Sequence, residues 1–499
     1  MPETDTKNLF KEFPSVVTTE WVNAINKDLK GADFDSKMVW KTSEGFNLNP
    51  FYREEDILNL KYTKSENNIL PVVRGYNTVN NNWDICQEIN VINIVEANKF
   101  AVDALKNGAD SISFVFNEDN NIKQYALQKL LKGISIENQK LRFNTSSDIV
   151  LLFNNIKKEY LNRKLNFKKA NIVFNYDPIC NFTISGNSKV LIKSNLLKHY
   201  ELLKEVTDNY QNIKIISINA NYFADAGCLL TQEIAYSIAI ASEYLSIFSE
   251  LGIEIKKIAN QITFNYGIGS NYFLEIAKLR AARVLWSKLL EAYIPNNSEI
   301  IQMIIHSITT SWNKSIYDKY NNVLRQTTEA MSSIIGGTQS LTIFPFDFKS
   351  ESNFSNRISR NIQIILKEEA HLDKVADIAG GSYYIENITD NLIKKSWELF
   401  LEIEDKGGYI KAFKDGFIQK QIKKVQEQRC LSIANQKEVI LGVNRYINVT
   451  EKFINEVKNN NMKIRSDFEP INIFSSDFEP INIFRGAHEI EMQNRNKLK

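Results

Sequence analysis

The sequence is poor in the residues that build metal sites and disulfide frameworks. Its 499 residues include only four histidines and four cysteines. The cysteines are widely scattered: Cys86, Cys180, Cys228 and Cys430. They show neither the paired spacing of a zinc site nor the dense spacing of a disulfide-stabilised domain. We therefore expect reduced and mostly buried thiols, as is typical of a cytoplasmic protein.

Long apolar runs and an excess of one charge are also missing. No stretch approaches the roughly 18 apolar residues of a membrane span. Residues 1–7 are polar and do not form the apolar core of a signal peptide. The formal net charge is +2, because 61 Lys and Arg nearly balance 59 Asp and Glu. These features give no basis for a nucleic-acid or membrane partner and predict a cytoplasmic location.

Short motifs for phosphate binding and ester hydrolysis are absent as well. The sequence contains no Walker-type loop, no Gly-x-Gly-x-x-Gly after a strand and no Gly-x-Ser-x-Gly elbow. The histidines are far apart and offer no metal pair. His306 is the most interesting of them, because it ends a predicted strand, but a hydrogen-bonded structural role is favoured over a catalytic one.

What the sequence does contain is a regular alternation of short β-rich runs and helical segments. Hydrophobic residues make up 43% of the chain, which is enough for a sizeable core. Strands are predicted near residues 85–94, 111–116, 149–153, 170–174, 213–218, 261–266, 301–306 and 341–344. Helices are predicted near 96–107, 122–132, 153–162, 192–208, 228–251, 270–289, 317–335 and 354–370. Eight of each predict an α/β protein with a (β/α)8 TIM barrel. A doubly wound open sheet is the alternative.

Four regions follow from this pattern. Residues 1–75 form an extension too poor in apolar residues for its own core, which we expect to wrap the barrel or a partner. Residues 76–375 form the barrel, residues 376–460 a helical segment, and residues 461–499 a tail. In the tail the sequence Ser-Asp-Phe-Glu-Pro-Ile-Asn-Ile-Phe occurs twice, at 466–474 and 476–484. Two copies are too few for a solenoid, so we expect an extended segment lying on a surface.

Several longer motifs are spread along the chain. They are Asn82-Trp83-Asp84-Ile85, residues 273–286, 320–323 with 328–331, Gly337-Thr338-Gln339-Ser340-Leu341, 357–361, 375–377 with 381–384, and Gly442-Val443-Asn444-Arg445-Tyr446. Through these motifs the sequence resembles the methylmalonyl-CoA mutase family, cobalamin-dependent isomerases that interconvert methylmalonyl-CoA and succinyl-CoA. The resemblance runs from about residue 20 to about residue 450. It implies a barrel whose bore, lined by small and polar residues, threads the pantetheine arm of coenzyme A.

The sequence departs from the family pattern on the first strand. Catalytic members carry Trp-x-Ile-Arg-Gln-Tyr there. The Arg holds the substrate carboxylate or the coenzyme tail, and the Tyr sits beside the reacting group. Here the corresponding positions are Cys86 and Glu88. A Cys cannot replace a bidentate Arg, and Glu88 would repel a carboxylate.

Two further positions of the family site have changed. The Gly-Tyr-His of catalytic members reads Ala220-Asn221-Tyr222, which removes the His that hydrogen-bonds the thioester carbonyl. An Arg and a Ser of the sixth strand correspond to Gln261 and Thr263. The resemblance therefore implies a degenerate site, in which the chain supplies no catalytic, cofactor-binding or metal-binding residue of its own.

Catalytic members also end in a flavodoxin-like domain that binds cobalamin through Asp-x-His-x-x-Gly. No such motif is present here, and only 11 residues follow His488. The resemblance implies a small (beta) subunit without its own cofactor. It would form a heterodimer with a large (alpha) subunit that carries adenosylcobalamin. Two alternatives stay open. One is an enzyme with non-radical chemistry that uses Glu88 and Tyr222 as an acid–base pair, and the other is a free-standing acyl-CoA-binding barrel.

Overall fold

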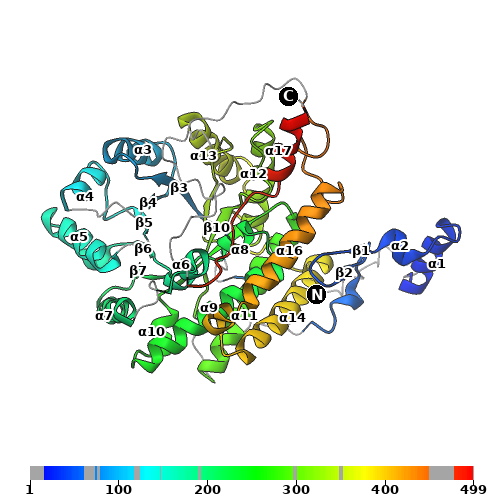
Figure 1. The fold of residues 1–499 in the computed structure, drawn as a ribbon, viewed down its shortest axis with the longest axis horizontal. Helices are drawn as coiled ribbons and strands as arrows, with labels where there is room; N and C mark the ends of the chain where they lie inside the picture. Colours follow the sequence, from blue (N-terminus) through cyan, green and yellow to red (C-terminus); the bar gives the residue numbers. More distant parts are fainter. Residues whose placement is uncertain are drawn as a thin grey trace, which may run out of the picture.

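The computed structural model describes residues 16–60, 73–75, 79–116, 124–145, 148–188, 193–295, 301–347, 352–448 and 477–497. The first copy of the duplicated sequence, residues 466–474, and parts of the N-terminal extension lie outside these ranges. Helices surround a central sheet, while α1 (Thr18–Asp28) and α2 (Phe34–Met38) project to one side (Figure 1).

The central sheet is a ring of parallel strands. It contains β3 (Asp84–Asn90), β4 (Ser111–Val115), β5 (Lys140–Asn144), β6 (Ile172–Asn175), β7 (Ile213–Lys214), β8 (Ile216–Ile218), β9 (Ile262–Ile268), β10 (Ile304–Thr309) and β11 (Ser340–Thr342). The last strand, β11, pairs in parallel with the first, β3. Only Ile215 separates β7 from β8, and the two together fill one position between β6 and β9. The predicted (β/α)8 barrel is confirmed, and the open doubly wound sheet is wrong.

One predicted strand is wrong. Residues 149–153 form the first turns of α5 (Ile149–Asn162), and the third strand is instead β5. The side chain of Asp148 caps this helix by accepting from Val150 N and Leu151 N. The apolar residues Ile149, Phe153 and Ile156 then recur with helical spacing on its buried face.

The helices follow the strands and cover the outside of the barrel. They are α3 (Ile94–Lys106), α4 (Gln124–Leu130), α5, α6 (Pro178–Ser185), α7 (Lys193–Asn209), α8 (Asn221–Asp225), α9 (Leu230–Glu250), α10 (Ile255–Ala259), α11 (Tyr272–Tyr293), α12 (Asn321–Ile335) and α13 (Asn353–Glu368). Beyond the barrel lie α14 (Tyr383–Asp405), α15 (Tyr409–Lys414), α16 (Phe417–Ala434) and α17 (His488–Lys497). The short 3-10 helices η1 (Glu54–Asp56) and η3 (Phe167–Lys169) complete the set described.

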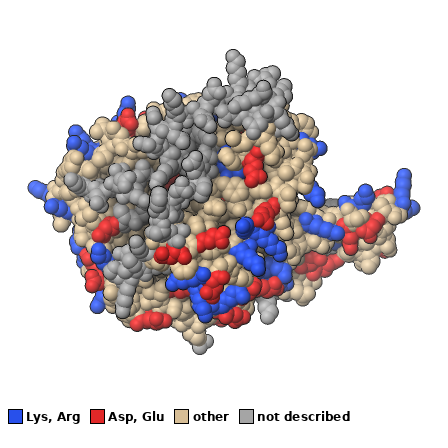
Figure 2. Space-filling view, in the orientation of Figure 1, with Lys and Arg blue, Asp and Glu red and all other residues tan. Residues whose placement is uncertain are grey.

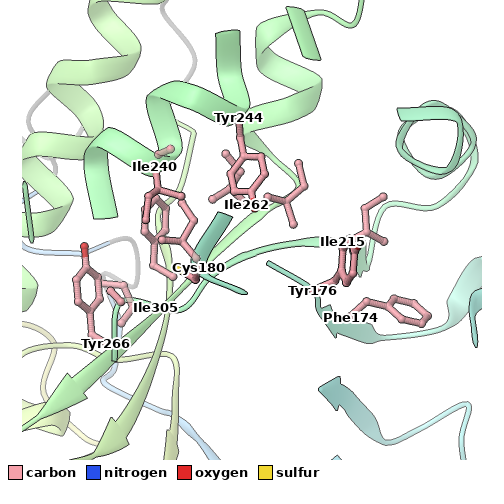
Figure 3. Close-up of a cluster of buried hydrophobic side chains, with 14 of the residues drawn as sticks. Phe174, Tyr176, Cys180, Ile215, Ile240, Tyr244, Ile262, Tyr266 and Ile305 are labelled. Carbon is pink, nitrogen blue, oxygen red and sulfur yellow. The ribbon is translucent and has the colours of Figure 1, made fainter. Parts of the chain in front are cut away.

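The main core lies between the outer face of the strands and these helices. Figure 3 shows Ile240 and Tyr244 of α9 pointing toward the strands, near Ile262 of β9. Each of these side chains is fully or almost fully buried. Burial of one such side chain contributes about 1.5–3 kcal/mol, so the outer layer holds the strands in place and frees their inner faces for other residues.

The N-terminal extension is only partly attached to the barrel. Glu44 accepts hydrogen bonds from Leu230 N and Thr231 N, both at 3.0 Å, at the start of α9. A small hairpin of β1 (Trp40–Lys41) and β2 (Asn47–Leu48) lies beside this contact. In contrast, α1 and α2 have no buried residue. The extension therefore reaches back to the barrel near residue 44 and leaves its first two helices outside the core.

Charges of both signs are interspersed over the described part of the face in Figure 2, including the projecting N-terminal helices. This distribution agrees with the small net charge of +2. Within the ranges described, no helix is both long and apolar enough to cross a membrane.

Candidate functional site in the barrel bore

The inner faces of the strands carry small hydroxyl side chains. Ser217 of β8 and Thr263 of β9 are both buried, and their hydroxyl oxygens are 2.8 Å apart. On the neighbouring strands, His306 Nδ1 lies 2.7 Å from Ser340 Oγ, and His306 Nε2 lies 3.2 Å from Thr342 Oγ1. Polar groups therefore face inward and are paired with one another, while the apolar residues of the same strands face the helices.

A charged residue lies across the middle of the bore. Arg142 of β5 donates from Nη2 to Asn265 Oδ1 of β9 at 2.8 Å. The two strands are not neighbours, so this bond passes through the interior. Asn265 in turn donates to Asn175 Oδ1 at 3.0 Å and to Asn219 Oδ1 at 2.8 Å. The four side chains form a buried network, which we call the bore network.

Two of the predicted site residues face Arg142. Cys86 and Glu88 lie on β3, and the strand register places Glu88 level with Ser113, which in turn is level with Arg142. Burial raises the pKa of the Cys86 thiol, and the nearby Arg142 charge opposes that rise. Burial also lowers the pKa of Arg142, against the attraction of Cys86 and Glu88. The thiol at position 86 is thus neutral, and the cation near it comes from β5.

The two site positions predicted on the sixth strand, Gln261 and Thr263, lie in different surroundings. Thr263 is hydrogen-bonded to Ser217 inside the bore. Gln261 is buried one residue before β9 begins, at the amino-terminal end of the strand, and its Oε1 has no hydrogen-bond partner. Function in this fold is carried by the opposite, carboxyl-terminal face. The structure therefore separates Gln261 from the other predicted positions along the barrel axis.

Asn221 and Tyr222 begin α8, at the carboxyl-terminal end of β8. Asn221 is buried, and neither its Oδ1 nor its Nδ2 has a hydrogen-bond partner. Tyr222 is half-buried and packs against the main core. Its ring is therefore partly buried beside the carboxyl-terminal end of β8.

The histidines do not form a reactive pair. His306 is held by two hydroxyls, as preferred from the sequence. His199 Nε2 lies 3.0 Å from the carbonyl oxygen of Ile215, and burial lowers its pKa to about 4. His371 and His488 are exposed. Among the residues that the structure describes, no three His, Cys, Asp or Glu side chains converge as a metal site.

Sequence reasoning missed the bore network. Its hub, Asn265, and its cation, Arg142, belong to no catalytic motif, and Arg142 lies on the one strand that was not predicted. The signal available was the alternation Lys140-Leu141-Arg142-Phe143-Asn144, with apolar residues at every second position.

The carboxyl-terminal face of the barrel is crossed by the chain terminus. Residues 477–487 contact the segments that follow β6, β8 and β10, through backbone bonds to Gly186, Asp225 and Trp312. In Figure 1 the red segment leads from this face to α17. The terminus thus lies where ligands approach the bore in this fold.

Comparisons with known proteins place similar sequences in one family. Residues 122–469 match the sequence model of the family described as methylmalonyl-CoA mutase. The chain is 38% identical over 453 residues to the methylmalonyl-CoA mutase small subunit of Porphyromonas gingivalis, covering 89% of this chain and 72% of that protein. It is 30% identical over 488 residues to the mitochondrial methylmalonyl-CoA mutase of Bos taurus, covering 90% of this chain and 63% of that protein. A methylmalonyl-CoA mutase of Cereibacter sphaeroides is 29% identical over 476 residues, with coverages of 89% and 66%.

Proposed function

Because the chain belongs to the methylmalonyl-CoA mutase family, we propose that it is the small subunit of a heterodimeric mutase and does not itself catalyse the isomerisation. The observation that carries the proposal is the bore network. A pantetheine arm threaded through the bore, as the family resemblance implies, would meet the buried 2.8 Å hydrogen bond between Arg142 and Asn265. The name of the relative from Porphyromonas gingivalis supports the small-subunit role.

The chemistry of the bore also favours this role. A substrate carboxylate needs a fixed cation with free donors. Cys86 is a neutral buried thiol, and Glu88 brings a negative charge to the same place. Arg142 supplies a guanidinium, but one of its nitrogens is held by Asn265. The group at position 222 is a half-buried phenol that packs against the core, so no imidazole is available there for a thioester carbonyl.

The residues near the bore mouth do not fit a corrin ring. Adenosylcobalamin supplies the radical chemistry of this family when it is bound, and its lower cobalt ligand is a histidine. Residues 477–487 lie across the carboxyl-terminal loops through backbone hydrogen bonds. His199 and His306 are buried and hydrogen-bonded inside the fold. We infer that the cofactor is bound by the large subunit.

The projecting N-terminal helices are the surface best suited to the partner. We call residues 16–38 the N-terminal arm. Val17 and Trp21 of this arm are about half exposed, and α1 and α2 contribute nothing to the core. Large apolar side chains on a projecting arm are typical of a segment that becomes buried on association.

The test is co-expression with the large subunit, followed by sizing and a mutase assay with adenosylcobalamin. We expect a heterodimer with activity, and no turnover from this chain alone. Restoring the family residues in the variant Cys86→Arg, Glu88→Tyr, Tyr222→His should still give no turnover from the isolated chain. Turnover by the isolated wild-type chain would overturn the proposal.

A binding experiment on the isolated chain tests the alternative of a free-standing acyl-CoA-binding barrel. Titration of the isolated chain with a coenzyme A thioester should give no binding heat, because Arg142 and Asn265 occupy the bore. Saturable binding without a partner would favour a free-standing binding protein.

A further inference from the structure

The terminal segment is recognised by the barrel through its backbone. Phe478 N donates to Gly186 O at 3.1 Å, and Ile481 N donates to Thr183 O at 3.1 Å. Both acceptors lie at the end of α6 or just after it. Bonds three residues apart along an extended chain fix its register on the surface beneath it.

Side chains of the segment alternate between the barrel and solvent. The ring of Phe478 contacts Phe182 edge-on, with the centroids 5.7 Å apart. Ile481 and Ile483 are buried, while Asn482 between them is exposed. The surface therefore selects an aromatic residue followed by two isoleucines at fixed spacing.

Two glutamines of α16 hold the same segment from its other side. Gln419 Nε2 donates to Glu479 O at 2.9 Å, and Gln426 Nε2 donates to Asn482 O at 3.3 Å. At the start of the segment, Asp477 accepts from the Ser188 hydroxyl. We call the surface formed by Phe182, Thr183, Gly186, Ser188, Gln419 and Gln426 the tail groove.

Every residue that these contacts use lies between Asp477 and Ile483. The same residues, in the same order and spacing, occur ten positions earlier at 467–473. Since identical side chains make identical contacts, we propose that the tail groove also accepts the first copy. The terminus then has two docking registers, ten residues apart, and this inference does not depend on the proposed function.

The residue after each copy decides between the registers. Arg485 follows the second copy and is fully buried, donating from Nη1 to Glu491 Oε2 at 2.8 Å and to Lys314 O at 3.1 Å. Ser475 follows the first copy. Docking of the first copy therefore gives up both charge-assisted hydrogen bonds of Arg485, which is unfavourable. The second copy is the preferred occupant, and the first is a minor one that releases Arg485 and α17.

The chain is long enough for either register. Eighteen residues separate Asn448, the last described residue before the tail, from Asp467. Such a stretch spans up to about 60 Å when extended. A compact chain of this length has a diameter of about 60 Å, so the first copy can reach the tail groove without unfolding the barrel.

Disulfide trapping in the full-length chain tests the two registers. Ser188→Cys is combined with either Asp477→Cys, which reports the second copy, or Asp467→Cys, which reports the first, with Cys430→Ser in every variant. After mild oxidation, cross-linked peptides are quantified by mass spectrometry. With the natural tail we expect the Asp467→Cys cross-link at less than about one tenth of the Asp477→Cys yield, since loss of 1.4 kcal/mol corresponds to tenfold.

The decisive variant is Arg485→Ser, which places the same residue after both copies and leaves both copies intact. It should raise the Asp467→Cys cross-link at least about tenfold. Adding Phe468→Ser, Ile471→Ser and Ile473→Ser should return the yield to its starting value. The proposal is overturned if Arg485→Ser leaves the yield unchanged, or if the added substitutions in the first copy do not reduce it. Circular dichroism of each variant checks that the barrel is folded.

Discussion

Arg142 on β5 and Asn265 on β9 are joined by a 2.8 Å hydrogen bond, although two strand positions separate them in the barrel. The bond holds a buried cation inside the barrel and joins two strands that are not neighbours. Together with the bonds from Asn265 to Asn175 and Asn219, it forms a buried polar network inside the barrel. The relationship links the stability of this barrel to its proposed loss of catalysis.

Arg142→Leu should destabilise the chain by about 1–3 kcal/mol, because Asn265 would lose a charged donor while staying buried. Chemical denaturation followed by tryptophan fluorescence measures the change. The matched control is Arg74→Leu, whose side chain is half-exposed and lies 3.8 Å from Asp377. That substitution should change stability by less than about 0.5 kcal/mol. Equal effects of the two substitutions would contradict a bore held by Arg142.

Stability should fall on mild acidification because of His199. Burial lowers the pKa of this residue to about 4, from an ordinary value of 6.5. Between these values the unfolded chain binds a proton that the folded chain does not, so the free energy of unfolding decreases as pH falls from about 6.5 to 4. From pH 7.5 to pH 5 the His199 contribution is about 2 kcal/mol.

The variant His199→Gln isolates this contribution, since a glutamine amide can still donate to the carbonyl of Ile215. Its free energy of unfolding should vary less with pH than that of the natural chain, by about 2 kcal/mol over the same interval. His371→Gln, at an exposed position, should leave the pH dependence as it was. If His199→Gln behaves like the control, the buried neutral imidazole is not the cause.

A close approach between Gly227 and Trp312 should not tolerate a methyl group. Gly227 has φ of +80°, and a Cβ there would lie 2.3 Å from Trp312 Cζ3. Gly252 has φ of +95° with nothing within 4 Å. Gly252→Ala therefore reports backbone strain alone, about 1 kcal/mol, and Gly227→Ala adds the clash.

We expect Gly227→Ala to cost at least about 1 kcal/mol more than Gly252→Ala. Thermal unfolding compares the two. In the background of Trp312→Ala the difference between them should shrink, because the clashing ring is gone. A difference that persists without the ring would count against the contact.

The buried Lys278 forms ion pairs with two carboxylates, one from α9 and one from α11. Lys278 Nζ lies 2.7 Å from Glu233 and 2.6 Å from Glu275, and all three residues are buried. Lys278→Met should cost about 3–5 kcal/mol, because two buried carboxylates lose their cation. Lys395→Met removes an exposed partner of Glu398, 2.8 Å away at the same i,i+3 spacing, and should cost less than about 0.5 kcal/mol. Urea denaturation of both variants at neutral pH makes the comparison.

The N-terminal arm should matter to the heterodimer and not to the isolated chain. Trp21→Ala removes a half-exposed ring that lies 5.6 Å from Phe51. If the arm contacts the large subunit, affinity should fall about tenfold or more, while the free energy of unfolding of the isolated chain changes by less than about 0.5 kcal/mol. Leu431→Ala, at an exposed position outside the arm, is the control. Isothermal titration with the large subunit measures the affinity of each variant, and urea denaturation measures its stability. Unchanged affinity for Trp21→Ala would show that the arm is not the interface.

The sequence by itself determined most of the barrel. Seven of the eight predicted strands lie near observed ones, because their apolar residues face the helices and make recognisable β-rich runs. Through the family resemblance it also predicted changed site positions at Cys86, Glu88 and Tyr222, which stand inside or beside the matching motifs. Both results depend on residues that are close together along the chain.

The tertiary structure alone decided what fills the bore. The strand of Arg142 was not predicted, because charged residues on an inward face carry no local sign of burial. The bond from Arg142 to Asn265 joins residues 123 apart in sequence. Likewise, the duplicated tail is visible in the sequence, but its groove is built from α6 and α16, which only folding brings together. Local patterns fix elements, whereas a polar side chain acquires its partner only when distant strands close into a barrel.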